Sequence, residues 1–88
     1  MTWNRDTLRA ELHNLLSRHA LAGSQIQPES RLVADLGIDS LGQMEVVADV
    51  EDAFKLMIPD SALREIETVA DIQNAVETRL QSEGRILE

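Results

Sequence analysis

The chain has 88 residues, of which 16 are acidic and eight are Lys or Arg, and it contains no cysteine. This length supports one small domain, and without cysteine the chain cannot form a disulfide, a thiolate nucleophile or a zinc-thiolate site. The formal net charge of -8 argues against nucleic acid as a partner, because phosphate backbones repel an acidic surface.

The N-terminal residues are polar, and no apolar run is long enough for a signal peptide or a membrane span. We therefore expect a cytoplasmic protein in which residues 1–88 form a single domain. The helical core is expected over about residues 4–82, with a short flexible tail over residues 83–88.

Apolar residues recur at helical spacing along almost the whole chain, which predicts an all-α fold. A first helix is expected over roughly residues 4–20, with Gly23 beyond its end. A long connection follows. Its apolar residues are expected to pack into the core, and they are Ile26, Leu32, Val33, Leu36 and Ile38.

A second helix is expected from Asp39 or Ser40 to Phe54 or Lys55, and a short third helix over residues 60–65. The segment at residues 68–71 has the form of a capping box and opens a fourth helix. The expected fold is a small four-helix bundle, with three longer helices, one short helix and a long first loop.

Ser40 lies at the start of the second helix, and no catalytic base accompanies it in the sequence. A serine hydroxyl is a poor nucleophile without such a base, and the Gly-x-Ser-x-Gly elbow of many hydrolases is absent here. The first turn of a helix favours a negatively charged group, because its backbone amides are unpaired. The sequence therefore predicts that Ser40 is modified and could carry a phosphodiester.

Two short motifs stand around Ser40, Asp35-Leu36-Gly37 before it and Asp39-Ser40-Leu41 at it. They resemble the Asp-Leu-Gly and Asp-Ser-Leu motifs of the acyl carrier proteins. Phe54 and the later Ile58-Pro59-Asp60 match elements downstream of the family's serine. The resemblance covers roughly residues 4–82, and the order and spacing of these elements make it specific.

The resemblance implies that a phosphopantetheinyl transferase moves 4'-phosphopantetheine from coenzyme A to Ser40, and that Asp39 belongs to the motif that this enzyme recognises. The thiol of the arm would then carry acyl groups as thioesters. The protein itself would be a carrier with no catalytic residue, and a monomer that serves acyl-loading, condensing and acyl-transfer enzymes.

The second helix has two apolar faces, although a monomer needs only one. Val46, Val47, Val50 and Phe54 form the core face. On the opposite side, apolar and acidic residues lie together beside Ser40, and residues 35–88 hold thirteen acids against four bases. We expect a docking surface for basic patches on partner enzymes, made of Leu41, Met44, Glu45, Ala48, Glu51 and Asp52. Taken alone, Glu51 and Asp49 would fit ordinary solvated charges.

No metal site is expected. Asp35 and Asp39 lie on either side of Gly37, but the remaining ligands of an EF-hand do not follow. His13 and His19 are expected to be ordinary surface or boundary residues, and neither is assigned a role.

The pathway is less strongly indicated than the carrier function. Gly42 stands where fatty-acid carriers often have an acid, and Lys55 also departs from the acidic pattern of the family. We therefore favour a free-standing carrier for a polyketide or another specialised acyl pathway, with primary fatty-acid synthesis close behind. The alternatives are an aminoacyl or peptidyl carrier and a helical interaction module that is never modified; a hydrolase that uses Ser40 ranks below both.

Overall fold

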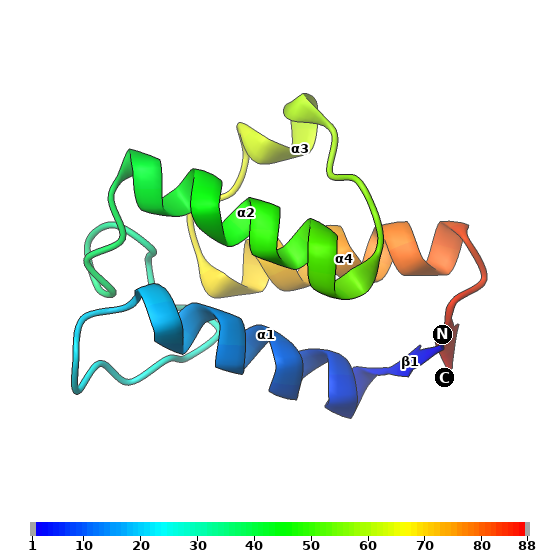
Figure 1. Cartoon of the computed structure of the whole chain (residues 1–88), viewed down its shortest axis with the longest axis horizontal. Helices are drawn as coiled ribbons and strands as arrows, with labels where there is room; N and C mark the ends of the chain where they lie inside the picture. Colours follow the sequence, from blue (N-terminus) through cyan, green and yellow to red (C-terminus); the bar gives the residue numbers. More distant parts are fainter. Residues whose placement is uncertain (1, 88) are drawn as a thin grey trace.

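The computed structural model describes residues 2–87 of the chain. Within them the chain forms four helices, α1 (Arg5–His19), α2 (Ser40–Phe54), α3 (Asp60–Leu63) and α4 (Val69–Ser82), and two short strands, β1 (Trp3–Asn4) and β2 (Ile86–Leu87). The three longer helices pack side by side, and short α3 stands apart at the edge of the bundle (Figure 1). The expected four-helix bundle is confirmed.

The three longer helices begin at residues whose side chains bond to the free amides of the first turn. Asn4 and Thr7 form a capping box at the start of α1, and Thr68 and Asp71 form another at the start of α4. At the start of α2, Asp39 accepts a hydrogen bond from the Gly42 amide. Such caps stabilise a helix by about 1 kcal/mol each, so the three starts are fixed by local sequence.

The core is formed by one apolar face of each longer helix, together with residues of the connecting segments. Val46, Val50 and Phe54 face inward from α2, as their spacing predicts. The fully buried side chains are Leu8, Leu12, Leu16, Leu32, Leu36, Ile38, Val46, Val50, Phe54, Ile72, Val76 and Leu80.

The long loop between α1 and α2 is packed against the helices. Leu32, Leu36 and Ile38 are buried and Ile26 is partly buried against the core, as expected. Val33 is different, with 58% of its surface exposed. The loop turns tightly here, since the Gly37 amide bonds to the Val33 carbonyl, and the turn directs Leu32 and Leu36 inward and Val33 outward.

The two ends of the chain meet in a short pairing of strands beside the helical bundle. β1 and β2 pair in parallel, with Trp3 opposite Ile86. The Arg85 side chain donates hydrogen bonds to the carbonyls of Phe54 and Lys55 at the end of α2. These contacts hold residues 85–87 against the bundle, because the last carbonyls of a helix lack intrahelical donors and Arg supplies them. Residue 88 lies outside the described part of the chain.

Candidate functional site

Ser40 is the first residue of α2, and its side chain is exposed. The first intrahelical bond runs from the Gln43 amide to the Asp39 carbonyl, at 2.8 Å. The Asp39 carboxylate is 2.8 Å from the Gly42 amide, so it is engaged as the helix cap. Ser40 therefore stands at a helix start fixed by the residue before it.

The Ser40 hydroxyl has no hydrogen-bond partner within residues 2–87, so no His or carboxylate is placed to remove its proton. A serine nucleophile needs an adjacent base. The geometry thus suits a hydroxyl that another enzyme modifies, and it does not provide the arrangement of a hydrolase.

A mainly apolar groove of about 280 Å³ begins at Ser40 and runs between α2 and the α3 region. Met44, Val47 and Ala48 line it from α2, and Leu63 and Ile66 line it from the opposite side. An extended apolar group attached to Ser40 could follow this groove.

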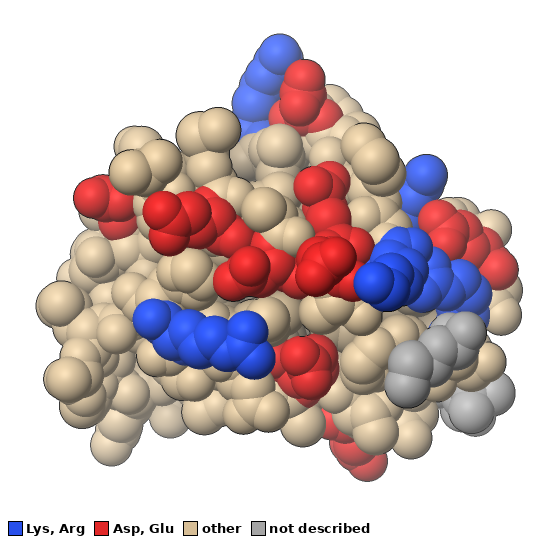
Figure 2. Space-filling view, in the orientation of Figure 1, with Lys and Arg blue, Asp and Glu red and all other residues tan. Residues whose placement is uncertain are grey.

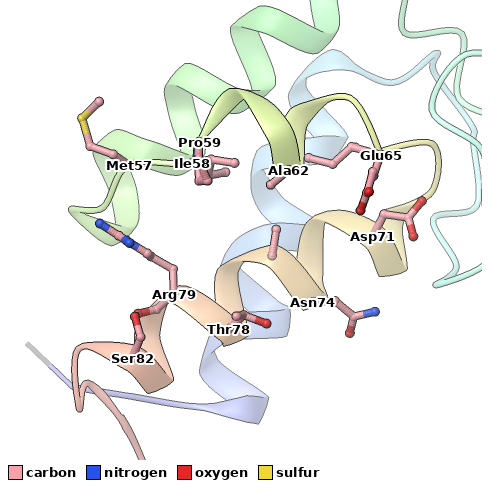
Figure 3. Close-up of a pocket in the computed structure, with 12 residues that line it drawn as sticks. Met57, Ile58, Pro59, Ala62, Glu65, Asp71, Asn74, Thr78, Arg79 and Ser82 are labelled. Carbon is pink, nitrogen blue, oxygen red and sulfur yellow. The ribbon is translucent and has the colours of Figure 1, made fainter.

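A larger hollow, of about 580 Å³, lies between α4 and the segment that contains α3 (Figure 3). Met57, Pro59 and Ala62 line one side, and Asn74 and Thr78 line the other. Ser40 does not border it. Size alone would therefore point to this hollow, whereas Ser40 lines the smaller groove.

The predicted docking surface is exposed at its apolar positions. Leu41 is 66% exposed and Met44 is 71% exposed, and Ala48 is exposed between them and the end of the helix. Acidic side chains form a band over α2 in Figure 2, and exposed Glu45 and Asp52 are among the acids of this helix. The structure thus brings apolar and acidic groups together beside Ser40.

Glu51 and Asp49 differ from ordinary solvated charges. The Glu51 carboxylate accepts a hydrogen bond from the Ile58 amide at 2.9 Å, and so ties the loop after α2 back to the helix. Asp49 lies 2.8 Å from the His19 ring of α1. The expectation that His19 is an ordinary boundary residue is incomplete, since it joins two helices. No local pattern signals either contact, because the partners are seven and thirty residues apart.

Gly42 has a physical reason in the structure. A Cβ atom at this position would lie 2.9 Å from Cγ2 of Ile38, which is buried. Contacts this short require a neighbour to move, and the branched side chain of a packed Ile moves only at a cost. Gly42 therefore allows Ile38 to pack under the first turn of α2.

Within residues 2–87, no three His, Asp or Glu side chains come together in a group that could hold a metal ion. None of the helices in the described part of the chain combines the length and the apolar character that a membrane crossing requires.

Comparison with known proteins identifies the family. A family model described as the phosphopantetheine attachment site matches residues 6–76. The chain is also 32% identical over 78 residues to an acyl carrier protein of Thermotoga maritima. The match covers 88% of this chain and 96% of that protein. This chain belongs to the acyl carrier protein family.

Other acyl carrier proteins show the same relationship. That of Helicobacter hepaticus is 32% identical over 72 residues, covering 82% of this chain and 95% of the relative. A solved structure described as an acyl carrier protein of Mycobacterium tuberculosis superposes with a TM-score of 0.66 at 27% identity, covering 84% of this chain and 95% of the other. A solved structure of a mitochondrial acyl carrier protein of Toxoplasma shares the fold, with a TM-score of 0.64 at 24% identity. The match covers 82% of this chain and 89% of the other.

Membership of the family confirms the resemblance in the sequence. Acyl carrier proteins are carriers rather than enzymes, and they bear a covalent 4'-phosphopantetheine group. As a family they interact with a phosphopantetheinyl transferase and with enzymes of acyl biosynthesis. The exposed hydroxyl of Ser40, its place at the start of α2 and the adjacent apolar groove fit such a group.

Proposed function

We propose that Ser40 is the residue that carries 4'-phosphopantetheine, and that Asp39 belongs to the motif read by the transferase. The observation that carries this proposal is an exposed hydroxyl at a helix start with no base beside it. In the loading step the Ser40 oxygen bonds to the pantetheine phosphate, the phosphoanhydride bond of coenzyme A breaks, and the adenosine part leaves with its remaining phosphates. The proton of the hydroxyl must pass to a base of the transferase, since this chain supplies none.

The start of α2 suits the resulting phosphodiester. The amides of Ser40 and Leu41 precede the first intrahelical bond, so they are available to a negatively charged group, and the helix dipole favours it there. When bound, the group supplies a terminal thiol that forms thioesters with acyl groups. The residues of the groove, Val47 and Ile66 among them, give the attached chain an apolar surface to lie on.

The docking surface would receive the enzymes that load, extend and remove the acyl group. Leu41, Met44 and Ala48 offer apolar contact, while Glu45 and Asp52 attract basic patches. Glu51 lies at the edge of this surface, but its carboxylate is held by the Ile58 amide, so we expect it to attract partners less than Asp52 does. A small footprint with charged steering gives fast association and brief residence, which a carrier that visits several enzymes requires.

The attachment is tested by incubating the protein with coenzyme A and a broad-specificity phosphopantetheinyl transferase. The intact mass should rise by one phosphopantetheine, and Ser40→Ala should abolish the rise. Ser61→Ala is a matched control, because Ser61 is also exposed, also follows an Asp and also lies at a helix start. No mass gain in the unaltered protein would favour the unmodified interaction module, and a gain that survives Ser40→Ala would place the arm elsewhere.

For the pathway, we favour a polyketide or another specialised acyl pathway over primary fatty-acid synthesis. The support is Gly42, since the acid that fatty-acid carriers often have at this place would push against buried Ile38. The loaded protein can be offered to the malonyltransferase of a fatty-acid synthase beside that system's own carrier. We expect this chain to accept malonyl groups severalfold more slowly; equal rates would favour fatty-acid synthesis.

A further inference from the structure

The last residue of α1 reaches across to the acidic helix. His19 Nε2 lies 2.8 Å from Asp49 Oδ2, and His19 Nδ1 lies 3.7 Å from Glu45 Oε2. The His19 side chain is 17% exposed, whereas those of Asp49 and Glu45 are 39% and 57% exposed. The imidazole is therefore mostly enclosed, and the two carboxylates that it meets remain open to solvent and to a partner.

Glu45 and Asp49 are four residues apart on α2, so their side chains lie on neighbouring turns of one face. Two carboxylates at this spacing repel each other, and a ring placed against both of them counters the repulsion when it carries a proton. Glu45 is part of the docking surface. One histidine of α1 thus lies against both acids along the edge of α2 that faces α1.

We infer that His19 is a positioning residue of the docking surface, and that its protonation sets how much negative charge α2 presents to a basic partner. The inference rests on the proposed function, because it takes α2 as the helix on which partners dock. It assigns His19 no part in the chemistry of the acyl group.

The charge of histidine is the one that ordinarily changes between pH 5 and 8. Among the described residues, the ionised side chains within 4 Å of the ring are Glu45 and Asp49 of α2; on α1 itself the neighbouring Arg18 is exposed. When the ring is neutral, both carboxylates count toward attraction of a basic patch. When it is protonated, one of those charges is cancelled, so association should slow as the pH falls.

A competition experiment isolates this effect. The unaltered protein and His19→Gln are mixed in equal amounts and loaded from coenzyme A by a phosphopantetheinyl transferase, with the two products separated by intact mass. Because both substrates share one tube, the pH dependence of the transferase itself cancels in the ratio of their rates. We expect a ratio close to one at pH 8, and at pH 6 a loading rate for the unaltered protein roughly two- to fivefold lower than that for the Gln variant.

His19→Lys places a permanent charge at the same position, so this variant should load slowly at both pH values. His13→Gln is the matched control, since His13 is an exposed histidine of the same helix that makes no hydrogen bond or ion pair to α2 within residues 2–87. Its ratio to the unaltered protein should stay at one at both pH values. Circular dichroism at both pH values checks that each variant is folded. If His19→Gln does not fold, the comparison of His19→Lys with His13→Gln tests the same charge effect.

The outcomes separate the two proposals. If none of the proteins gains mass, the proposed function fails. If all load but the ratio of the unaltered protein to His19→Gln is the same at pH 6 and pH 8, or His19→Lys loads as fast as His19→Gln, then His19 does not control docking and the carrier function stands.

Discussion

The ring of Trp3 lies against the ring of Phe54, with centroids 4.6 Å apart and planes inclined by 53°. Trp3 belongs to β1 and Phe54 is the last residue of α2, so this contact joins the beginning of the chain to the end of the helix that starts at Ser40. Tilted aromatic pairs at this distance stabilise a protein beyond the area that they bury. The N-terminal segment therefore helps to set the position of α2.

Trp3→Ala should lower the free energy of unfolding by about 2 to 3 kcal/mol, because it removes a large, partly buried ring that packs against the core. Urea denaturation followed by circular dichroism measures the change. Met57→Ala serves as the control: Met57 is 70% exposed, and its loss should change stability by about 0.5 kcal/mol or less. If both variants unfold at the same urea concentration as the unaltered protein, the segment at Trp3 does not support α2.

Gly42→Ala tests the close approach of Ile38 to the first turn of α2. Helix propensity alone would make this change stabilising by about 1 kcal/mol. The new Cβ would lie 2.9 Å from Ile38 Cγ2, so we expect no gain or a net loss of stability. Urea denaturation of Gly42→Ala in the unaltered protein and in an Ile38→Leu background decides the cause. Leu lacks the branch at Cβ, so Gly42→Ala should be less unfavourable in that background, and an equal effect in both backgrounds would contradict the proposed clash.

Asp71 links the stability of the fold to pH. Its carboxylate accepts hydrogen bonds from the amides of Glu67 and Thr68, each at 2.9 Å, and these bonds lower the pKa of Asp71 below its ordinary value of 3.8. The unfolded chain therefore binds a proton at a higher pH than the folded chain does. The stabilisation is complete above about pH 5, and it is lost as the pH falls through the pKa of the folded state.

Asp71→Ala should lower the free energy of unfolding by about 1 kcal/mol at pH 7, the usual effect of losing a helix cap. The difference from the unaltered protein should shrink as the pH falls below about 4 and through the pKa of the folded state, below which the carboxylate is protonated in both states. Denaturation in urea at pH 7 and at pH 3 measures it. Asp60→Ala is the control, since no side-chain bond of Asp60 caps α3. A difference that persists undiminished at pH 3 would show that ionisation of Asp71 is not the cause.

The sequence predicts features that depend on local patterns. The start of α2 follows from Asp39 and Ser40, and the exposure of Leu41 and Met44 follows from the helical spacing of the core residues that they oppose. The same patterns place Val33 in the core, because they cannot show that the tight turn closed by Gly37 directs it outward.

Contacts between distant parts of the chain lie beyond such patterns. His19 and Asp49 are thirty residues apart, and Arg85 and Phe54 are thirty-one residues apart. A charged residue on an exposed helix face and one that crosses to another helix look the same in the sequence, since only the packing angle of the helices brings the partners together. The sequence therefore does not predict the tertiary partners of the acids on α2, which the structure shows.

Glu51 and Asp52 are adjacent acids with different roles, and this difference can be measured. The Glu51 carboxylate accepts a bond from the Ile58 amide at 2.9 Å, whereas the Asp52 side chain is 88% exposed and lies 3.8 Å from Lys55. Glu51→Ala should lower the free energy of unfolding by about 1 to 2 kcal/mol, because it leaves the Ile58 amide without its acceptor. Asp52→Ala should leave the stability unchanged, because exposed ion pairs contribute little.

Loading by the transferase should show the opposite order. Asp52→Ala removes a charge that attracts a basic partner, so it should slow loading at low salt, and the effect should fade at high salt as the charge is screened. Glu51→Ala should load at nearly the rate of the unaltered protein, since the Glu51 carboxylate faces the loop. The assay is run without urea and well below the unfolding temperature of the variant. Initial rates at two salt concentrations measure both effects. If Glu51→Ala slows loading as strongly as Asp52→Ala, with the same dependence on salt, then partners contact Glu51 directly and its bond to Ile58 does not remove it from the docking surface.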